Sequence, residues 1–417
     1  MQAVNINHFS MKFLLLIALF GAFYINAVPQ SRPQKPDAAK GNQKKNQRAA
    51  QKTEEERKQE EARRKQEEEE KNAVLDPGVL KIDTNVVNVD TVVYNKKSGE
   101  IITGLKKENF AIFENGVKQE ITNFATPEAP ITVSLVVEYS KWSEVFGLYG
   151  SRGMEAGKLE VVRPVAFFLS RFIKAPDDYA SVIAFDIRPT PITDFTNDPN
   201  RLRQTVDILL RNSPAFRENN LFDAVKFALV GGRGDSVVLE DTKERTSEYG
   251  GMISVKAKRR AIILVASGID TFSKINYDQV RKVIQNSGIP IYIISTGNLF
   301  YKLYEGQLEP TDSISGMPGR LTFLQAQNAM NTFAKESGGK HFPMTFEGEL
   351  PAILGSINAL LRNQYSLAYD GGEKPRDGKK YKLDVKVDID GDGAYEEKTY
   401  IIQHRPFYTA AKDSAKN

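Results

Sequence analysis

The stretch 131-ITVSLVVEYSKWSE-144 decides which fold class the sequence predicts. It begins with mainly aliphatic and β-branched residues and changes abruptly to polar ones at Glu138 and Ser140. A continuous apolar run of this length is typical of a parallel strand that is buried on both faces. We therefore expect a strand over 131–138 whose carboxyl end delivers Glu138 and Ser140 to a polar site.

Apolar strands alternate with helices along the region that this stretch opens. The expected strands are 131–138, 180–186, 260–267, 289–295 and 364–370. The expected helices are 156–173, 199–210, 221–230, 276–286, 320–337 and 347–361. This alternation favours an α/β fold with a doubly wound, mostly parallel sheet that helices cover on both faces. Two polar, glycine-rich insertions are expected in loops, at 232–258 and 298–320.

Shorter segments on both sides of this region read as antiparallel β structure. Residues 79–128 alternate apolar and polar side chains and contain Asn115-Gly116, a strong signal for a hairpin turn. We expect a small antiparallel β domain there, followed by the α/β domain at 129–370. A C-terminal β-hairpin extension at 371–408 and a disordered tail at 409–417 complete the prediction.

The N-terminal segments predict where the protein is located. A basic residue, the apolar run 13-FLLLIALFGAFYI-25 and a small residue at Ala27 describe a signal peptide over 1–27. A retained membrane anchor is the alternative. Residues 28–78 are rich in Gln, Lys, Arg and Glu, and we expect a disordered tether there, with a solvated single helix as the alternative. The predicted location is secreted, or periplasmic and attached to the cell envelope.

The composition excludes several kinds of function. The chain has 417 residues and no cysteine, so disulfides, thiol catalysis and cysteine–zinc sites are excluded. A net charge of +4 without a long basic stripe in the globular part argues against nucleic acid as a partner. No G-x-S-x-G, H-E-x-x-H or P-loop motif is present. We expect no enzymatic activity, and His341 and His404 are expected to be surface or packing residues.

Several motifs, taken in order, resemble a known family. They are GLKKENFAIFENGVKQEITNF from Gly104, ITVSLVVEYS from Ile131, ENNLFDAVKFAL from Glu218, RAIILVASGIDTFS from Arg260, and the closing QYSLAYD and HRPFYTA. This series resembles the von Willebrand factor A domain, and more closely a bacterial family of secreted proteins related to it. The resemblance runs from about Leu80 to about Tyr408 and implies an α/β binding domain.

The resemblance also implies a metal-ion-dependent adhesion site, built on D-x-S-x-S, a Thr and an Asp. Glu138 stands at the first Asp position, and Ser140 keeps the first Ser. The remaining positions carry Trp142 (with Ser143 one residue late), Asn219 and Ser267, while Asp270 and Asp186 lie near enough in sequence to substitute. Mg²⁺ demands near-ideal octahedral geometry, so we expect a degenerate site. A functional site holding Mg²⁺ or Ca²⁺ is the alternative.

Two further motifs carry separate hypotheses. The run 388-DIDGDGAYEEKT-399 begins like a calcium loop through Asp388, Asp390 and Asp392. An EF-hand would need Glu at the twelfth position, where Thr399 stands, so an ordinary turn is the alternative. The tripeptide 233–235 matches the Arg-Gly-Asp integrin motif, and we interpret it as a chance match.

Together these features predict a secreted, non-enzymatic binding or adhesion module. Its partner is expected to be an unknown protein or a cell-envelope ligand, with membrane contact only through an uncleaved signal segment. We expect contact through the carboxyl end of the sheet, at loops 138–143, 219–220 and 267–273, because loops on a rigid scaffold carry recognition. No cofactor is expected. An extracytoplasmic hydrolase of unrecognised type and a structural envelope-attached protein are the alternatives.

Overall fold

A computed structural model describes residues 86–127, 129–141, 156–212, 214, 216–233, 248–257, 259–314, 316–372 and 378–410. The predicted signal peptide, the tether, residues 411–417 of the predicted tail, the Arg-Gly-Asp tripeptide as a whole, Trp142 and Ser143 lie outside the described residues. Thr409, placed in the predicted disordered tail, is instead the last residue of a strand. Among the helices of the described ranges, none has the length and apolar character needed to cross a membrane.

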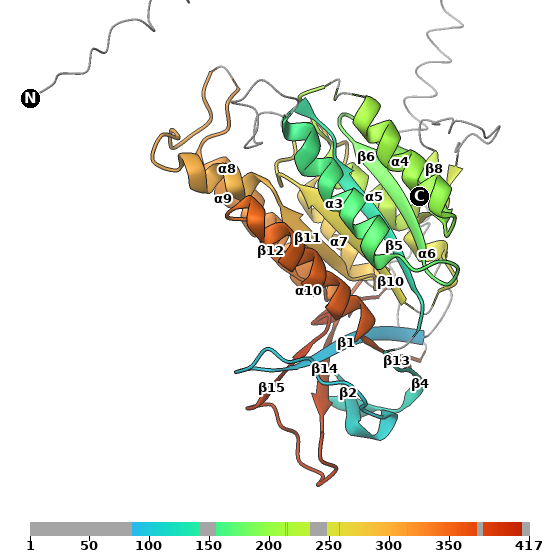
Figure 1. The fold of residues 1–417 in the computed structure, drawn as a ribbon. Coiled ribbons are helices and arrows are strands. Elements are labelled where there is room, and N and C mark those ends of the chain that lie inside the picture. The colour runs from blue at the N-terminus through green and yellow to red at the C-terminus, as the bar shows by residue number, and fades with distance from the viewer. Residues whose placement is uncertain are drawn as a thin grey trace, which may run out of the picture. The chain divides into compact units, whose positions relative to one another are not determined.

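A six-stranded, mostly parallel sheet forms the centre of the α/β part (Figure 1), with the order β12-β11-β10-β5-β6-β7. Its strands are β5 (Ile131–Glu138), β6 (Tyr179–Phe185), β7 (Pro189–Thr196), β10 (Arg259–Ala266), β11 (Ile291–Ser295) and β12 (His341–Pro343). All neighbouring pairs are parallel except β6 and β7. Every residue of β5 is buried, which explains its continuous apolar run. The predicted α/β class with a mostly parallel sheet is confirmed.

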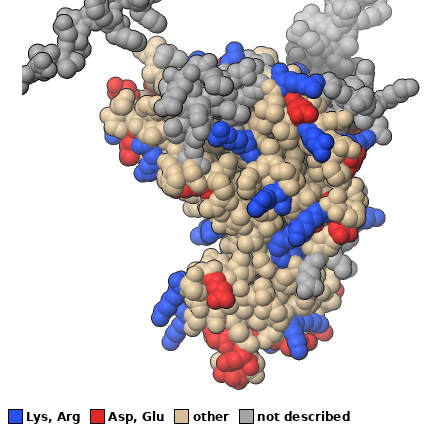
Figure 2. Space-filling model, in the orientation of Figure 1, with Lys and Arg blue, Asp and Glu red and all other residues tan. Residues whose placement is uncertain are grey.

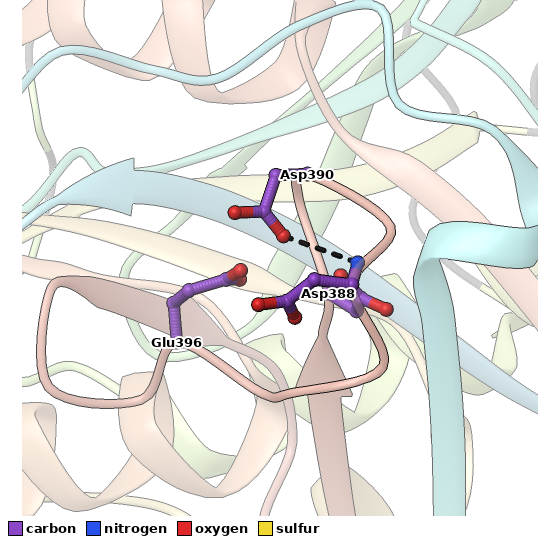
Figure 3. Close-up of side chains that lie close together, drawn as sticks. Asp388, Asp390 and Glu396 are labelled. Carbon is purple, nitrogen blue, oxygen red and sulfur yellow. Dashed lines mark hydrogen bonds between the residues drawn. The ribbon is translucent and has the colours of Figure 1, made fainter.

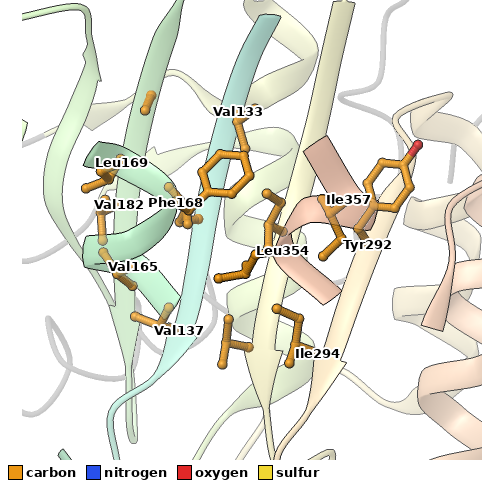
Figure 4. Packing of buried hydrophobic residues seen from close by; sticks show 14 of the residues in the cluster. Val133, Val137, Val165, Phe168, Leu169, Val182, Tyr292, Ile294, Leu354 and Ile357 are labelled. Carbon is orange, nitrogen blue, oxygen red and sulfur yellow. The ribbon is translucent and has the colours of Figure 1, made fainter. Parts of the chain in front are cut away.

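Helices cover both faces of this sheet. They are α3 (Ala156–Phe172), α4 (Pro199–Arg211), α5 (Leu221–Val230), α6 (Gly251–Ser254), α7 (Tyr277–Ser287), α8 (Gly297–Tyr304), α9 (Arg320–Ser337) and α10 (Leu350–Arg362). Alternate residues of the central strands enter different cores. Ile263 packs with α3, α4 and α10 in one core, and its neighbour Ile262 packs with α5, α7 and α9 in the other. Figure 4 shows the first core, with Phe168 of α3 and Leu354 of α10 lying over the strands.

The structure contains several elements that the sequence patterns missed. β7 is an antiparallel edge strand, β12 has three residues, α6 lies inside the insertion expected at 232–258, and α8 begins one residue before the insertion expected at 298–320. A short or partly exposed element produces too few repeats of a hydrophobic period to be recognised. A further pair of two-residue strands, β8 (Gly232–Arg233) and β9 (Glu248–Tyr249), lies at the ends of the insertion at 232–258.

The remaining strands form two four-stranded antiparallel sheets that share one core. One sheet has the order β15-β1-β13-β4, and the other has the order β16-β14-β2-β3. Their bounds are β1 (Val86–Asn95), β2 (Phe110–Glu114), β3 (Val117–Gln119), β4 (Ile121–Ala125), β13 (Tyr365–Asp370), β14 (Lys380–Val387), β15 (Tyr400–Gln403) and β16 (Phe407–Thr409). A one-turn 3-10 helix, Lys107–Asn109, precedes β2. Asn115 and Gly116 both have positive φ, as the predicted hairpin turn between β2 and β3 requires.

Two strand predictions are wrong in their pairing. The strand expected at 364–370 was placed in the α/β sheet, but β13 lies between β1 and β4 in an antiparallel sheet. The C-terminal hairpin expected within 371–408 does not form, because β14 pairs with β2 and β16 while β15 pairs with β1. Apolar periodicity identifies a strand without identifying its partner. Because β4 and β13 pair in one sheet, the α/β part that lies between them in the sequence is an insertion into the β part.

The chain passes between the β part and the α/β part twice, and one buried arginine contacts both passages. Arg259, at the start of β10, donates through Nη1 to the carbonyl oxygens of Pro127 (2.6 Å), Leu361 (3.2 Å) and Arg362 (2.9 Å). Its Nη2 donates to the carbonyl oxygen of Thr126. The same guanidinium group thus holds residues 126–127, which lead from β4 to β5, and the carboxyl end of α10.

A second buried group lies beside these passages. The carboxylate of Asp178 accepts hydrogen bonds from the backbone N–H groups of Ile131 (3.0 Å) and Lys174 (2.9 Å). Arg362 donates to both of its oxygens, through Nη1 to Oδ1 at 3.0 Å and through Nη2 to Oδ2. This ion pair therefore connects the end of α10 to the starts of β5 and β6.

Candidate functional site

Four of the side chains predicted to meet at the carboxyl end of the sheet do meet. Glu138 is the last residue of β5, Ser267 directly follows β10, and these strands are parallel neighbours with Val137 opposite Val265. Ser140 lies two residues beyond Glu138, and Asn219 precedes α5. Glu138 is 2 % exposed, and the other three side chains are also buried. We call these four residues the Glu138 cluster.

The other three members of the cluster surround the Glu138 carboxylate. Ser140 Oγ and Asn219 Nδ2 donate to Glu138 Oε1 at 2.9 and 3.0 Å. The backbone N–H and the hydroxyl of Ser267 both donate to Oε2 at 2.7 Å. Burial raises the pKa of the Glu138 carboxyl above its ordinary value, and the hydrogen bonds from Ser267, Ser140 and Asn219 offset only part of this effect.

The geometry of the cluster does not fit a divalent cation. A carboxylate offers about four lone-pair positions, and four donors of this chain already use those of Glu138. Mg²⁺ and Ca²⁺ need carboxylate and hydroxyl oxygens with free lone pairs. Within the cluster, Asn219 Oδ1 is a buried acceptor without a hydrogen-bond partner, but a single amide oxygen falls short of the about six to eight oxygen ligands that Ca²⁺ takes. A cation would have to displace the donors that hold the carboxylate.

The two carboxylates that could substitute have other partners. Asp270 Oδ1 accepts hydrogen bonds from the N–H of Phe222 (3.2 Å) and from Ser273 Oγ (2.5 Å), which places it at the start of α5. Asp186 Oδ1 accepts from the N–H of Arg188 at 3.4 Å. No hydrogen bond between the described residues joins either carboxylate to the Glu138 cluster.

Backbone hydrogen bonds connect the loops around the cluster. The N–H groups of Thr271 and Phe272 donate to the carbonyl oxygen of Asn219 at 3.0 and 2.8 Å, and the Asn219 N–H donates to Thr271 Oγ1 at 2.8 Å. The Lys141 N–H donates to the carbonyl oxygen of Phe216 at 2.7 Å. The loops that follow β5 and β10 and the loop that precedes α5 therefore form one connected platform.

Large apolar side chains project from this edge of the sheet into solvent. Phe272 lies in the loop after β10 and Phe346 in the loop after β12, and each is 58 % exposed. We call them the edge phenylalanines. The segment from α8 to the first turns of α9, which follows β11, adds the exposed residues Leu303, Tyr304, Ile314, Met317, Leu321 and Leu324. Sequence reasoning missed these residues because a hydrophobic period does not show whether an apolar side chain in a helix or a loop is exposed.

The acidic loop 388–399 brings together more carboxylates than the sequence hypothesis named. Carboxylate oxygens of Asp388, Asp390, Asp392 and Glu396 lie within 4.8 Å of one another. Figure 3 shows the side chains of Asp388, Asp390 and Glu396 facing the same small volume. Glu396 is at the ninth position of the loop, whereas the EF-hand pattern requires its glutamate at the twelfth. Its Oε2 accepts the N–H of Ile389 at 2.9 Å.

The calcium loop stays a prediction, and Ca²⁺ titration by calorimetry tests it. We expect weak binding, with a Kd on the order of 10⁻⁴–10⁻³ M, because a divalent cation would relieve the repulsion among four carboxylates. Asp390→Asn should weaken binding at least about tenfold. Glu397→Gln is the matched control, because Glu397 lies in the same loop but pairs with Lys386 at 2.7 Å. Binding that Asp390→Asn leaves unchanged would disprove the prediction.

On one face of the molecule, the described basic and acidic side chains are mixed. On the face drawn in Figure 2, lysine and arginine side chains are interspersed with acidic ones. Acidic side chains gather at the lower end, where Figure 1 places the loop between β14 and β15. The absence of nucleic acid as a partner stays a prediction.

Comparisons with known proteins find similarity in structure alone. No family model matches the chain, and no curated protein matches its sequence. The PilB minor pilin of Streptococcus sanguinis is 14 % identical, with a TM-score of 0.39 over 57 % of this chain and 62 % of the pilin. The von Willebrand factor domain of the type V pili tip protein Mfa5 from Porphyromonas gingivalis is 19 % identical, with a TM-score of 0.24 over 35 % of this chain and 40 % of that chain.

A third similar structure is BatB of Bacteroides thetaiotaomicron, which is 11 % identical with a TM-score of 0.34. That match covers 55 % of this chain and 98 % of BatB. The chain spans less than two thirds of the pilin's length. These likenesses are too low to support an argument about function. The chain is a mixed α/β protein, with a mostly parallel sheet and separate antiparallel sheets, and it is similar to pilus proteins and to a von Willebrand factor domain.

Proposed function

We propose that the chain is a secreted, non-enzymatic binding module of the von Willebrand factor A type. It binds a protein of the cell envelope through the carboxyl edge of its mostly parallel sheet. The observation that carries the proposal is the exposure of the edge phenylalanines on that edge. Large apolar side chains that remain in water on an ordered surface mark interaction sites, and aromatic residues dominate binding energy there.

The Glu138 cluster supports a structural role at this edge rather than a metal-dependent one. Its four hydrogen bonds hold the ends of β5 and β10 against the residue that precedes α5. Asn219 belongs to the cluster and also accepts the backbone N–H of Phe272. The cluster thus fixes the loop that carries one edge phenylalanine, which reduces the ordering that binding would otherwise require.

The surroundings of the two described histidines support a non-enzymatic function. His341 Nε2 is buried without a partner, and burial lowers the pKa of the imidazole to about 4. His404 Nε2 accepts the Val385 N–H at 3.3 Å, and its Nδ1 lies 2.8 Å from the carbonyl oxygen of Arg405. Among the described residues, no hydrogen bond joins either ring to a serine hydroxyl or a carboxylate. A general base needs such a partner within hydrogen-bond reach.

Binding of the purified protein to immobilised envelope fractions tests the proposal. We expect Phe272→Ser together with Phe346→Ser to weaken binding at least about tenfold, because buried aromatic anchors carry most of an interface's energy. Val117→Ser is the control, since Val117 is 64 % exposed on β3, away from this edge. A chelator should leave binding unchanged. Equal losses in both variants, or no loss in the phenylalanine variant, would rule out this surface.

The two alternative functions predict different results. A hydrolase would turn over ester, peptide or glycoside substrates in broad assays, and His341→Ala would abolish that activity. A structural protein attached through its tether would lose localisation when residues 29–78 are deleted. In our proposal that deletion leaves binding through the α/β part intact.

A further inference from the structure

A cavity of about 350 Å³ opens beside the Glu138 cluster, on the face of the sheet that α5, α7 and α9 cover. The residues that determine its chemistry are Phe222, Ile269, Asp270, Tyr277, Gln325 and Ala329. The loop after β10 supplies Ile269 and Asp270, and α9 supplies Gln325 and Ala329. The cavity shares only Asp270 with the predicted adhesion site, and none of its lining residues belongs to the calcium loop.

The walls of the cavity are apolar and aromatic, with one charged group. The rings of Phe222 and Tyr277 lie 6.1 Å apart at 57°, and Ile269 and Ala329 add aliphatic surface. Asp270 is the single charged residue in the lining, and the other polar groups there are neutral. Binding cavities combine these features: a mostly apolar wall and a few polar groups that fix orientation.

Asp270 has no positively charged partner in the described part of the chain. Its Oδ1 accepts the Phe222 N–H and the Ser273 hydroxyl, but no ion pair joins it to a lysine or an arginine. Burial raises the pKa of its carboxyl, and the nearby carboxylate of Asp223 acts in the same direction. Arg281 lies over the ring of Tyr277, but Glu336 holds it in a bidentate pair.

We propose that this cavity binds a lysine or arginine side chain of the protein partner, with the cationic group on Asp270 and the aliphatic stem against Phe222 and Ile269. The inference rests on the proposed function and names the chemistry of one contact. An anionic group would meet the Asp270 and Asp223 carboxylates. A purely apolar group would leave the Asp270 carboxylate without a counter-charge in the contact, which is costly.

The size and position of the cavity support this occupant. Its volume lies at the lower end of the range of about 300–1,000 Å³ for ligand pockets, which suits one long side chain. Long cationic side chains bury their methylene groups on apolar surface while the charge keeps a polar partner. Asp270 is two residues from Phe272, so one partner can contact an edge phenylalanine and the cavity together.

Two small probes test the chemistry directly. Nα-acetyl-L-arginine amide and Nα-acetyl-L-citrulline amide have nearly the same shape, but only the first carries a charge. Each is titrated into the full ¹⁵N-labelled chain, and the backbone shifts of Phe222, Ile269 and Tyr277 are followed. We expect the arginine probe to saturate these shifts with a Kd on the order of 1 mM, as its size allows, and the citrulline probe to bind at least about tenfold more weakly.

Matched variants identify the carboxylate responsible. Asp270→Asn should remove the difference between the two probes while α5 stays folded, because asparagine can still accept the Phe222 N–H. Asp278→Asn is the control, since Asp278 follows Tyr277 on α7 but is exposed and paired with Arg281. Ala329→Leu should weaken both probes by filling the cavity.

The possible results separate this inference from the proposed function. Equal binding of the two probes, arginine binding unchanged in Asp270→Asn, or shifts located elsewhere would overturn the inference. So would loss of the arginine probe in Asp270→Asn with binding to envelope fractions unchanged, because the site would then take a small cation instead of the partner. Failure of the Phe272 and Phe346 test, with the probes binding as expected, would instead overturn the proposed function alone.

Discussion

Replacing Glu138 by alanine is expected to lower the free energy of unfolding by at least about 3 kcal/mol. The substitution would leave the Asn219 amide, the backbone N–H of Ser267 and two serine hydroxyls without their acceptor in a buried site. Each unsatisfied buried donor costs about 1–3 kcal/mol, and rotation of the hydroxyls recovers only part of that cost. Urea unfolding of the purified chain at pH 7 measures the difference.

Glutamine at position 138 is expected to change stability by less than about 1 kcal/mol at pH 7. Its oxygen can accept both donors of Ser267, and its amide can donate to Ser140 Oγ and to Asn219 after that side chain flips. Asn219 Oδ1 has no partner in the present arrangement, so the flip places it where it gains one. A loss with glutamine as large as the loss with alanine would show that the hydrogen bonds of the cluster are not what the site contributes.

The same pair of proteins has a predictable pH dependence. Burial raises the pKa of Glu138 in the folded state above its ordinary value of 4.5. The stabilisation that results from this raised pKa is therefore fully present below pH 4.5, where the carboxyl is protonated, and is lost as pH rises through the folded-state pKa. Glu138→Gln lacks this loss, so its stability relative to the natural protein should increase from pH 4 to pH 7. Glu108→Gln, at an exposed position, is the control for the change from glutamate to glutamine.

Replacing Asp178 by alanine is the second change with a large expected effect, a loss of about 3–5 kcal/mol. The side chain of Asp178 is 1 % exposed and makes a bidentate pair with Arg362, which is 22 % exposed and would remain as a partly buried cation without its partner. The backbone N–H groups of Ile131 and Lys174 would also lose their acceptor. Adding Arg362→Met to Asp178→Ala should recover part of the loss, because the second substitution removes the unpaired charge.

Acid titration provides an independent check on Asp178. Burial acts against ionisation, but the hydrogen bonds from Arg362, Ile131 and Lys174 outweigh it and lower the pKa below the ordinary 3.8. The stabilising contribution is therefore present above pH 3.8 and is lost as pH falls through the folded-state pKa. Unfolding curves between pH 5 and pH 2 should show this loss in the natural protein and a smaller one in Asp178→Asn. Parallel curves for the two proteins would contradict the assignment.

The sequence predicted the central strands and the meeting of the Glu138 cluster for one physical reason. A parallel strand buried on both faces has an unbroken apolar run, and the ends of neighbouring parallel strands lie side by side. The structure has β5 over the predicted residues and brings Glu138, Ser140, Asn219 and Ser267 together. What the residue types could not reveal was that the chain's own donors use every lone pair of that carboxylate.

Other features depended on contacts between distant segments. Leu367, Ala368 and Tyr369 of β13 are all buried, so the strand resembles a central strand of the parallel sheet, and nothing in its residues identifies β1 and β4 as its partners. Asp270 looked like a substitute ligand because of its place in the sequence, whereas its hydrogen bonds connect it to α5. The cavity beside it depends on α9, which begins 50 residues later, at Arg320. Such a juxtaposition leaves no local signal in a single sequence.

The insertion of the α/β part between β4 and β13 has a mechanical consequence. Both connections between the inserted part and the β part lie at the amino edge of the α/β sheet. There Arg259 donates to the carbonyl oxygen of Thr126 on one connection and to that of Arg362 on the other. A partner that pulls on the opposite edge of the sheet would apply force to both connections at the same time. The force would be transmitted to the antiparallel sheets through the region around Arg259. Neither connection could be separated from that region without also loading the other.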